Sequence, residues 1–163
     1  MKITMSEVRK LLPAFSLIIM LLSCSIGKVR LPEEFYGFKL MNKMTGDEAK
    51  KFVDQLHFNE VAPQKNEIGF YESPAGKLII YITYYDDNVK SLAEYEKMID
   101  KISPDNSVFY DPSIIKINQK DIYRCYGMGQ VHYVFASGKE LYWVSIDPQF
   151  GEKFIAEYLN HIK

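Results

Sequence analysis

Cysteine is scarce in this sequence. Its 163 residues include only Cys24 and Cys125, and Cys24 closely follows an apolar N-terminal segment. If Cys24 is set aside, the single remaining cysteine cannot form an internal disulfide, so the sequence predicts a domain that is held together by side-chain packing. We expect Cys125 to be a small buried hydrophobic residue; a reactive thiol is the less favoured interpretation.

Histidine is almost as scarce, which argues against a metal centre. His57, His132 and His161 are the only histidines, and no two of them have the His-x-x-x-His spacing of a helical zinc site. Asp86–Asn88 lacks the pattern of a calcium-binding loop. Gly127–Gly129 is too short for a phosphate-binding fingerprint and is expected to join two strands. The sequence therefore predicts no metal and no cofactor.

Runs of like charge and basic patches are also missing. The sequence has 20 lysines and arginines against 21 aspartates and glutamates, a formal net charge of −1. Proteins that bind nucleic acid concentrate basic residues on one face, so nucleic acid is not an expected partner. The apolar stretch Leu11–Leu22 is shorter than the ~20 residues that a helix needs to cross a bilayer, which argues against a transmembrane anchor.

The first 23 residues have the layout of a secretory signal peptide. Lys2, Arg9 and Lys10 form a basic start, an apolar core follows, and Ser23 is a small residue directly before Cys24. This order is typical of a segment that directs export and is then removed. The remaining 140 residues, 24–163, would have a formal net charge of −3.

Leu21-Leu22-Ser23-Cys24 resembles the lipobox of bacterial lipoproteins. The resemblance implies cleavage before Cys24, diacylation of its sulfur and room for a further acyl chain, such as palmitate, on the new amino group. Two chains anchor a protein stably where one does not. We therefore expect an exported protein of the cell envelope whose partner is the membrane, through its lipid anchor. Ser25 resembles the signal for the outer membrane, if the source is diderm.

The rest of the chain is predicted to be a short tether, residues 24–34, and one α+β domain, residues 35–163. Helices are expected at Gly46–His57, where Thr45 and Glu48 can form a capping box, and at Val89–Ile102. A last helix is expected to open at Asp147-Pro148. The expected strands are Ile68–Glu72, Lys77–Asp86, Val108–Tyr110, Ile114–Ile117, Asp121–Tyr126, Gln130–Ala136 and Glu140–Ile146, with a further short one within Phe35–Met44.

Most of these strands follow one another through tight turns, so the sheet should be mainly antiparallel, with about five to seven strands and three helices packed against it. The last three strands form a meander. A Ser137-Gly138 turn would place His132 opposite Trp143. The preceding turn has three alternatives: Met128-Gly129 places Cys125 opposite His132, Gly127-Met128 places them diagonally, and a three-residue loop places them on opposite faces. We favour Gly127-Met128, because glycine at the first position suits a type II′ turn.

A thiol beside an imidazole can be an activated nucleophile. Cys125 and His132 are therefore the candidate catalytic residues of an alternative function, a thiol- or metal-dependent enzyme. The favoured interpretation is a buried cysteine beside a histidine that bonds a neighbour, because no family-specific cysteine signature accompanies the pair.

A second resemblance covers much of the chain after the signal. The segments that carry it are Thr45–Ala49, Leu56-His57, Gly129–Phe135 and Tyr142-Trp143. Together they are similar to a family of small, uncharacterised bacterial export proteins. The resemblance implies a single fold and directs attention to His57 and His132, but it implies no reaction.

Aromatic residues are abundant, with 12 tyrosines and 10 phenylalanines beside the single tryptophan. Tyrosine and tryptophan favour places that are apolar on one side and wet on the other, as on a sheet with a binding face. Tyr133, Trp143 and His57 are therefore the candidate binding residues. We expect a non-catalytic, lipid-anchored binding or structural lipoprotein whose partner is an envelope protein or a small apolar ligand.

Overall fold

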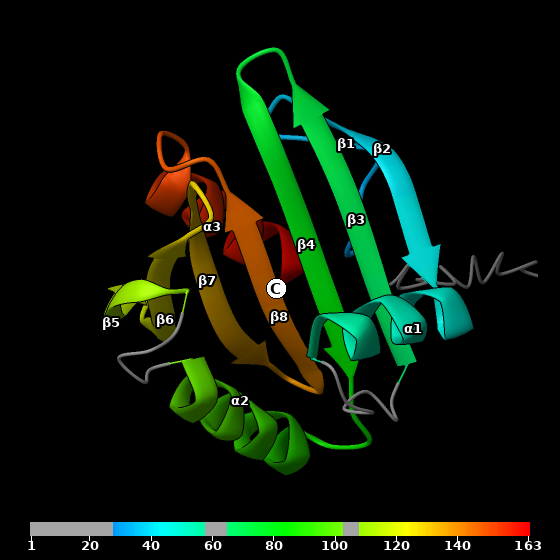
Figure 1. Ribbon diagram of the computed structural model, residues 1–163, viewed down its shortest axis with the longest axis vertical. Helices are drawn as coiled ribbons and strands as arrows, with labels where there is room; N and C mark the ends of the chain where they lie inside the picture. The colour runs from blue at the N-terminus through cyan, green and yellow to red at the C-terminus, as the bar shows by residue number, and fades with distance from the viewer. Residues whose placement is uncertain (1–27, 58–64, 103–107) are drawn as a thin grey trace, which may run out of the picture.

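The computed structural model describes residues 28–57, 65–102 and 108–163. This part of the chain forms an eight-stranded antiparallel sheet and three helices, which confirms the predicted α+β class (Figure 1). The sheet has the strand order β1-β2-β3-β4-β8-β7-β6-β5. The elements along the chain are β1 (Glu34–Phe35), β2 (Phe38–Thr45), α1 (Gly46–His57), β3 (Lys65–Ser73), β4 (Gly76–Tyr84), α2 (Asn88–Ile102), β5 (Tyr110–Ile117), β6 (Lys120–Gly127), β7 (Gln130–Ser137), β8 (Glu140–Ile146) and α3 (Gly151–Ile162).

Strand β4 connects the two halves of the sheet, because its pairing with β8 joins β1-β2-β3-β4 to β8-β7-β6-β5. It pairs with β3 through a two-residue turn and with β8 across a long sequence gap. The sequence predicts a central strand here because Leu78–Tyr85 is apolar at nearly every position. The structure confirms this, since β4 has helices over both of its faces (Figure 1).

Helix α3 covers one face of the sheet. Its predicted apolar side is buried against alternate residues of the central strands. Ile80, Tyr142 and Phe135, which all point to this face, are each at most 1% exposed. Each fully buried side chain of this size contributes roughly 1.5–3 kcal/mol, so this larger cluster is the main source of stability.

Helices α1 and α2 lie on the opposite face of the sheet from α3 (Figure 1). Helix α1 packs on β2 and β3, and α2 packs on β7 and β8. The residues that point to this face alternate with those under α3, so Phe70, Tyr81, Trp143 and His132 all share it. None of the helices in the described part of the chain is long and apolar enough to cross a membrane.

Both turns of the β6–β7–β8 meander differ from the favoured predictions by one position. Gly127 pairs with Gln130, so the first turn is Met128-Gly129, and Cys125 lies directly opposite His132. Ser137 pairs with Glu140, so the second turn is Gly138-Lys139. Glycine therefore takes the first central position of the second turn, where its φ is +60°, as a type II′ turn requires.

In the observed register Trp143 pairs with a residue of β7 that is two positions away from the predicted partner. Trp143 lies opposite Val134, and His132 lies opposite Ser145. Because the shift is two residues and not one, Trp143 and His132 keep the same face of the sheet. The predicted proximity of Trp143 and His132 is therefore correct, although the pairing that was expected to produce it is wrong.

The start of α3 also differs from the prediction. Asp147-Pro148 precedes the helix without opening it, and the first helical residue is Gly151. The Asp147 carboxylate instead accepts a hydrogen bond from the backbone nitrogen of Lys77 at 2.9 Å. Aspartate can bond any nearby backbone N–H, and here the start of β4, the strand paired with β8, supplies one.

The segment before β1 is part of the domain, which corrects the boundary predicted for the tether. Leu31 is 4% exposed and belongs to the α3-side core. Arg30 binds Glu140 at 3.1 Å and the Ile162 carbonyl at 2.9 Å, and the Tyr158 hydroxyl donates to the Arg30 carbonyl. The sequence pattern hid this docking because Val29 and Leu31 are too few apolar residues to establish a period.

Candidate functional site

A cavity of about 470 Å³ lies on the face of the sheet that carries α1 and α2. Its floor consists of side chains from three adjacent strands: Tyr81 and Thr83 on β4, Trp143 and Ser145 on β8, and His132 on β7. They meet because opposite residues in paired strands share a face, and Tyr81 lies opposite Trp143. Ligand cavities are typically about 300–1,000 Å³ and mostly apolar, so this cavity is large enough for a small molecule.

The walls of the cavity come from segments that are far apart in the sequence. Val53 of α1 lies on one side, and Met98 and Ile102 of α2 lie on another. Val108 and Met128 complete the wall beside the β6–β7 turn. These two side chains are 69% and 73% exposed, although both are apolar, so this part of the wall presents apolar surface to solvent.

Phe109 packs between the cavity and the β6–β7 turn. Its ring lies 5.0 Å from the His132 ring and 5.4 Å from the Trp143 ring, centroid to centroid. A Cβ on Gly127 would lie 2.7 Å from the Phe109 ring, so only glycine at this position lets the ring pack so closely. Gly127, which is not predicted as a site residue, therefore shapes the cavity through the space that it leaves.

The polar atoms of the floor form one hydrogen-bonded network. The Trp143 Nε1–H lies 2.9 Å from Ser145 Oγ and 3.2 Å from His132 Nδ1. Ser145 Oγ lies 2.9 Å from His132 Nδ1, and His132 Nε2 lies 3.0 Å from the Gly127 carbonyl oxygen. A carbonyl can only accept a hydrogen bond and an indole nitrogen can only donate one. His132 is therefore the neutral tautomer with its proton on Nε2.

Burial, like this hydrogen-bonded network, favours the neutral form of the His132 ring. Desolvation lowers the pKa of His132, and the bond to the Gly127 carbonyl offsets the shift only in part. A protonated ring would also turn a second donor, Nδ1–H, toward the indole N–H. Both effects keep the ring neutral, so the network is a rigid structural support for the Trp143 side chain at the floor of the cavity.

Cys125 lies opposite His132 in the register, as one predicted alternative had it, but the pair does not have the properties of an activated nucleophile. Cys125 is fully buried, and burial raises the pKa of its thiol to about 11. Both ring nitrogens of His132 are bonded to other partners. Since the thiolate is the nucleophile, a raised pKa works against catalysis. The geometry supports Cys125 as a buried hydrophobic residue in the cluster under α2.

The other predicted site residues lie in different places. Tyr133 is 2% exposed and points to the α3 face, away from the cavity, because it is one residue along β7 from His132. It is therefore a core residue and not a binding residue. His57 is the last residue of α1, and its side chain lies outside the described part of the structure, as does Cys24. Trp143 is the predicted binding residue that lines the cavity.

Sequence reasoning missed the contribution of α2, Phe109 and Ser145. Ser145 had a usable signal, because it lies two residues from Trp143 and therefore on the same face of β8. The α2 residues Glu94, Lys97 and Lys101 also line the cavity. Their spacing places them on one side of a helix, but the sequence does not show that this side faces a cavity. Among the described residues, no group of three or more histidines, cysteines or carboxylates is placed to hold a metal ion.

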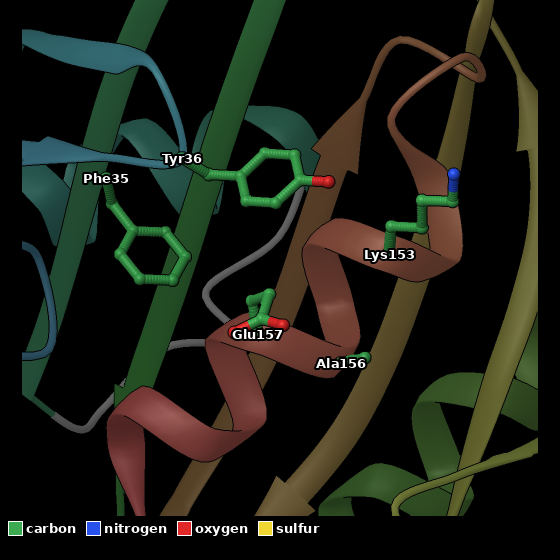
Figure 2. A pocket seen from close by; sticks show the side chains of 5 residues that line it. All are labelled: Phe35, Tyr36, Lys153, Ala156 and Glu157. Atoms are coloured by element: carbon green, nitrogen blue, oxygen red, sulfur yellow. The ribbon is translucent and has the colours of Figure 1, made fainter.

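A second hollow, of about 390 Å³, lies on the other side of the molecule between the β1–β2 turn and α3. Figure 2 shows Phe35 and Tyr36 on one side of it, and Lys153, Ala156 and Glu157 along the helix on the other. The Phe35 ring also packs edge-on against Phe154, at a centroid distance of 5.6 Å. This hollow is more open than the cavity, and the residues that line it are few, so the cavity under α2 is the stronger candidate site.

Comparisons with known proteins do not indicate a function for this chain. No protein-family model matches the chain, and no curated protein matches it significantly. A solved structure with a similar fold is that of a GTP binding regulator from Thermotoga maritima, which is 11% identical over 83% of this chain and 91% of that chain, with a TM-score of 0.47. A likeness this distant says nothing about what the present chain binds.

Proposed function

We propose that this protein is a lipid-anchored binding protein of the cell envelope that holds a small, mostly apolar ligand in the cavity between α1 and α2. The observation that carries the proposal is the cavity itself. It is lined mainly by aromatic and aliphatic side chains, and the few polar atoms on its floor are already bonded to one another. Such a site can desolvate an apolar molecule without leaving polar groups unpaired.

The anchoring part of the proposal has a separate basis. It rests on the lipobox resemblance of residues 21–24 and on the basic and apolar segments before them. A binding domain that is anchored by lipid would act at the membrane surface and need no catalytic group. The alternative function, a thiol-dependent enzyme, is disfavoured by the buried thiol and by the bonded imidazole.

Energy transfer from Trp143 tests the binding proposal, because Trp143 is the only tryptophan and it lines the cavity. The probe is N-phenylnaphthylamine, a neutral aromatic molecule whose emission rises in apolar surroundings. The full chain is used with Cys24→Ser, so that no acyl group competes for the probe. We expect saturable transfer from Trp143 to the bound probe.

A pair of matched variants makes this test specific to the cavity. Val53→Phe adds volume to the cavity wall, and an overpacking cost of about 1–3 kcal/mol should weaken probe binding by at least about fivefold. Val89→Phe makes the same change on α2 at a residue that is 73% exposed and outside the cavity, and it should bind the probe as the parent chain does. Equal binding by both variants would refute the proposed site.

A further inference from the structure

Three charged side chains of α2 line the cavity along one side of the helix: Glu94, Lys97 and Lys101. The Lys97 ammonium lies 2.6 Å from the Glu94 carboxylate, so these two charges largely cancel. Lys101 is exposed, and no carboxylate among the described residues forms an ion pair with it. The described edge of the cavity along α2 therefore has one positive charge without a negative partner.

On the floor of the cavity, in contrast, the polar side chains are already hydrogen-bonded to one another or to Asn66. The Thr83 hydroxyl donates to Asn66 at 2.8 Å, and the polar atoms of Trp143, Ser145 and His132 bond one another. A polar ligand group at the floor would have to break one of these bonds, and a buried donor or acceptor that loses its partner costs about 1–3 kcal/mol. An apolar group has no such cost, so the polar part of a ligand is best placed at the edge with Lys101.

The aromatic rings in the lining also favour one shape of ligand over others. Tyr81 of β4, Trp143 of β8 and Phe109, which directly precedes β5, supply ring surface to the lining. Aromatic rings pair best with other flat groups, either offset-stacked or edge to face. The lining therefore favours a flat apolar body over a globular or strongly branched one.

We propose that the ligand is a small amphipathic molecule with a flat apolar body, which lies against the Trp143 floor, and one anionic group, which pairs with Lys101. This rests on the proposed function, because it names the ligand class for the same cavity. A carboxylate, sulfonate or phosphate would serve equally well as the anionic group. Lys101 also complements the dipole at the C-terminal end of α2, and the experiment must separate that structural role from ligand recognition.

Two probes with the same ring system separate the apolar and anionic contributions. N-phenylnaphthylamine is neutral, and anilinonaphthalene sulfonate has the same rings with one sulfonate added. Binding of each is followed by energy transfer from Trp143 in the full-length Cys24→Ser chain. All variants share residues 1–27, so any uptake of probe by that segment is the same in each and cancels in the comparison.

The central variant is Lys101→Gln. We expect it to weaken sulfonate binding by about two- to fivefold at low salt, as the loss of an exposed ion pair should, and to leave binding of the neutral probe unchanged. Salt should reduce the same difference in the parent chain. Glu94→Gln should strengthen sulfonate binding, because it removes the carboxylate that neutralises Lys97.

Lys90→Gln is the matched control. It removes the same charge from the same helix at a residue outside the cavity, and it should bind both probes as the parent chain does. If Lys101→Gln binds the sulfonate as the parent chain does, or weakens both probes equally, the anionic class is wrong, whereas the proposed function still stands. If neither probe binds the parent chain, the proposed function fails as well.

Discussion

The imidazole of His132 can accept a proton only at the expense of its own hydrogen bonds. Its Nε2–H donates to the Gly127 carbonyl, and its Nδ1 accepts from the groups around it. Desolvation lowers the pKa of this ring below its ordinary value of 6.5. The ring is therefore neutral in the folded protein at a pH where the unfolded chain already binds a proton.

This difference predicts a pH dependence of stability. Above about pH 6.5 both states are neutral at this ring, and its contribution to folding is fully present. As the pH falls from 6.5 toward the lower folded pKa, the unfolded state binds more protons, and the free energy of unfolding decreases. Denaturant melts at pH 7 and pH 5 should show a larger loss for the wild type than for His132→Gln. Equal losses would show that another group causes the dependence.

At the scale of elements, the β6–β7 turn has a backbone conformation that carries an energetic cost. Both of its central residues have positive φ, 51° at Met128 and 78° at Gly129, as a type I′ turn requires. Methionine has no preference for this region, and Met128 is 73% exposed. The strands evidently determine the turn here, because Gly127-Met128 would have the better turn residues but a different pairing of β6 with β7.

Met128→Asn should therefore stabilise the protein, by about 0.5–1 kcal/mol, because Asn-Gly is a favoured type I′ pair and asparagine tolerates positive φ. Chemical denaturation measures the effect directly. Gly129→Ala is the opposite control and should destabilise, since alanine at this φ is strained. A less stable Met128→Asn protein would mean that contacts of the methionine outweigh the strain of its backbone.

At the scale of the whole molecule, the chain directly before β1 packs on the domain. His161 lies 2.8 Å from the Val29 carbonyl, and Leu31 is buried in the core. A chain extends at most about 3.5 Å per residue, so the five residue steps from Cys24 to Val29 can span at most about 18 Å. If Cys24 is acylated, the domain is held close to the membrane surface and not at the end of a long spacer.

Cys24→Ala should leave an uncleaved precursor, because the proposed processing requires the acylated sulfur. Mass spectrometry of the membrane fraction should find the wild-type chain beginning at an acylated Cys24 and the variant at its full length. Ser23→Ala is a suitable control, since it keeps a small residue before the cysteine and should be processed normally. A wild-type chain that is unmodified and starts at another residue would refute the anchor.

Most of the fold could be predicted from the sequence because its elements are locally encoded. The bounds of α1 match the prediction, and the buried residues Phe154, Ile155, Tyr158, Leu159 and Ile162 are those that helical spacing places on one side of α3. The strand count of five to seven is close to the observed eight. The segment Phe35–Met44, which was expected to hold one short strand, contributes to both β1 and β2, and the two short strands expected at Val108–Tyr110 and Ile114–Ile117 are replaced by the single strand β5.

The register and the site were decided by tertiary structure. Gly127, Met128 and Gly129 allow more than one turn, and the choice depends on pairing along β6 and β7 and on the Phe109 ring, which packs where Gly127 has no side chain. The cavity depends on where α1 and α2 rest on the sheet, a matter of packing between residues far apart in the chain. The sequence alone determined the α+β class and the shared face of His132 and Trp143, because periodicity and alternation are local properties. Only the fold could place α2 and its lysine beside that face.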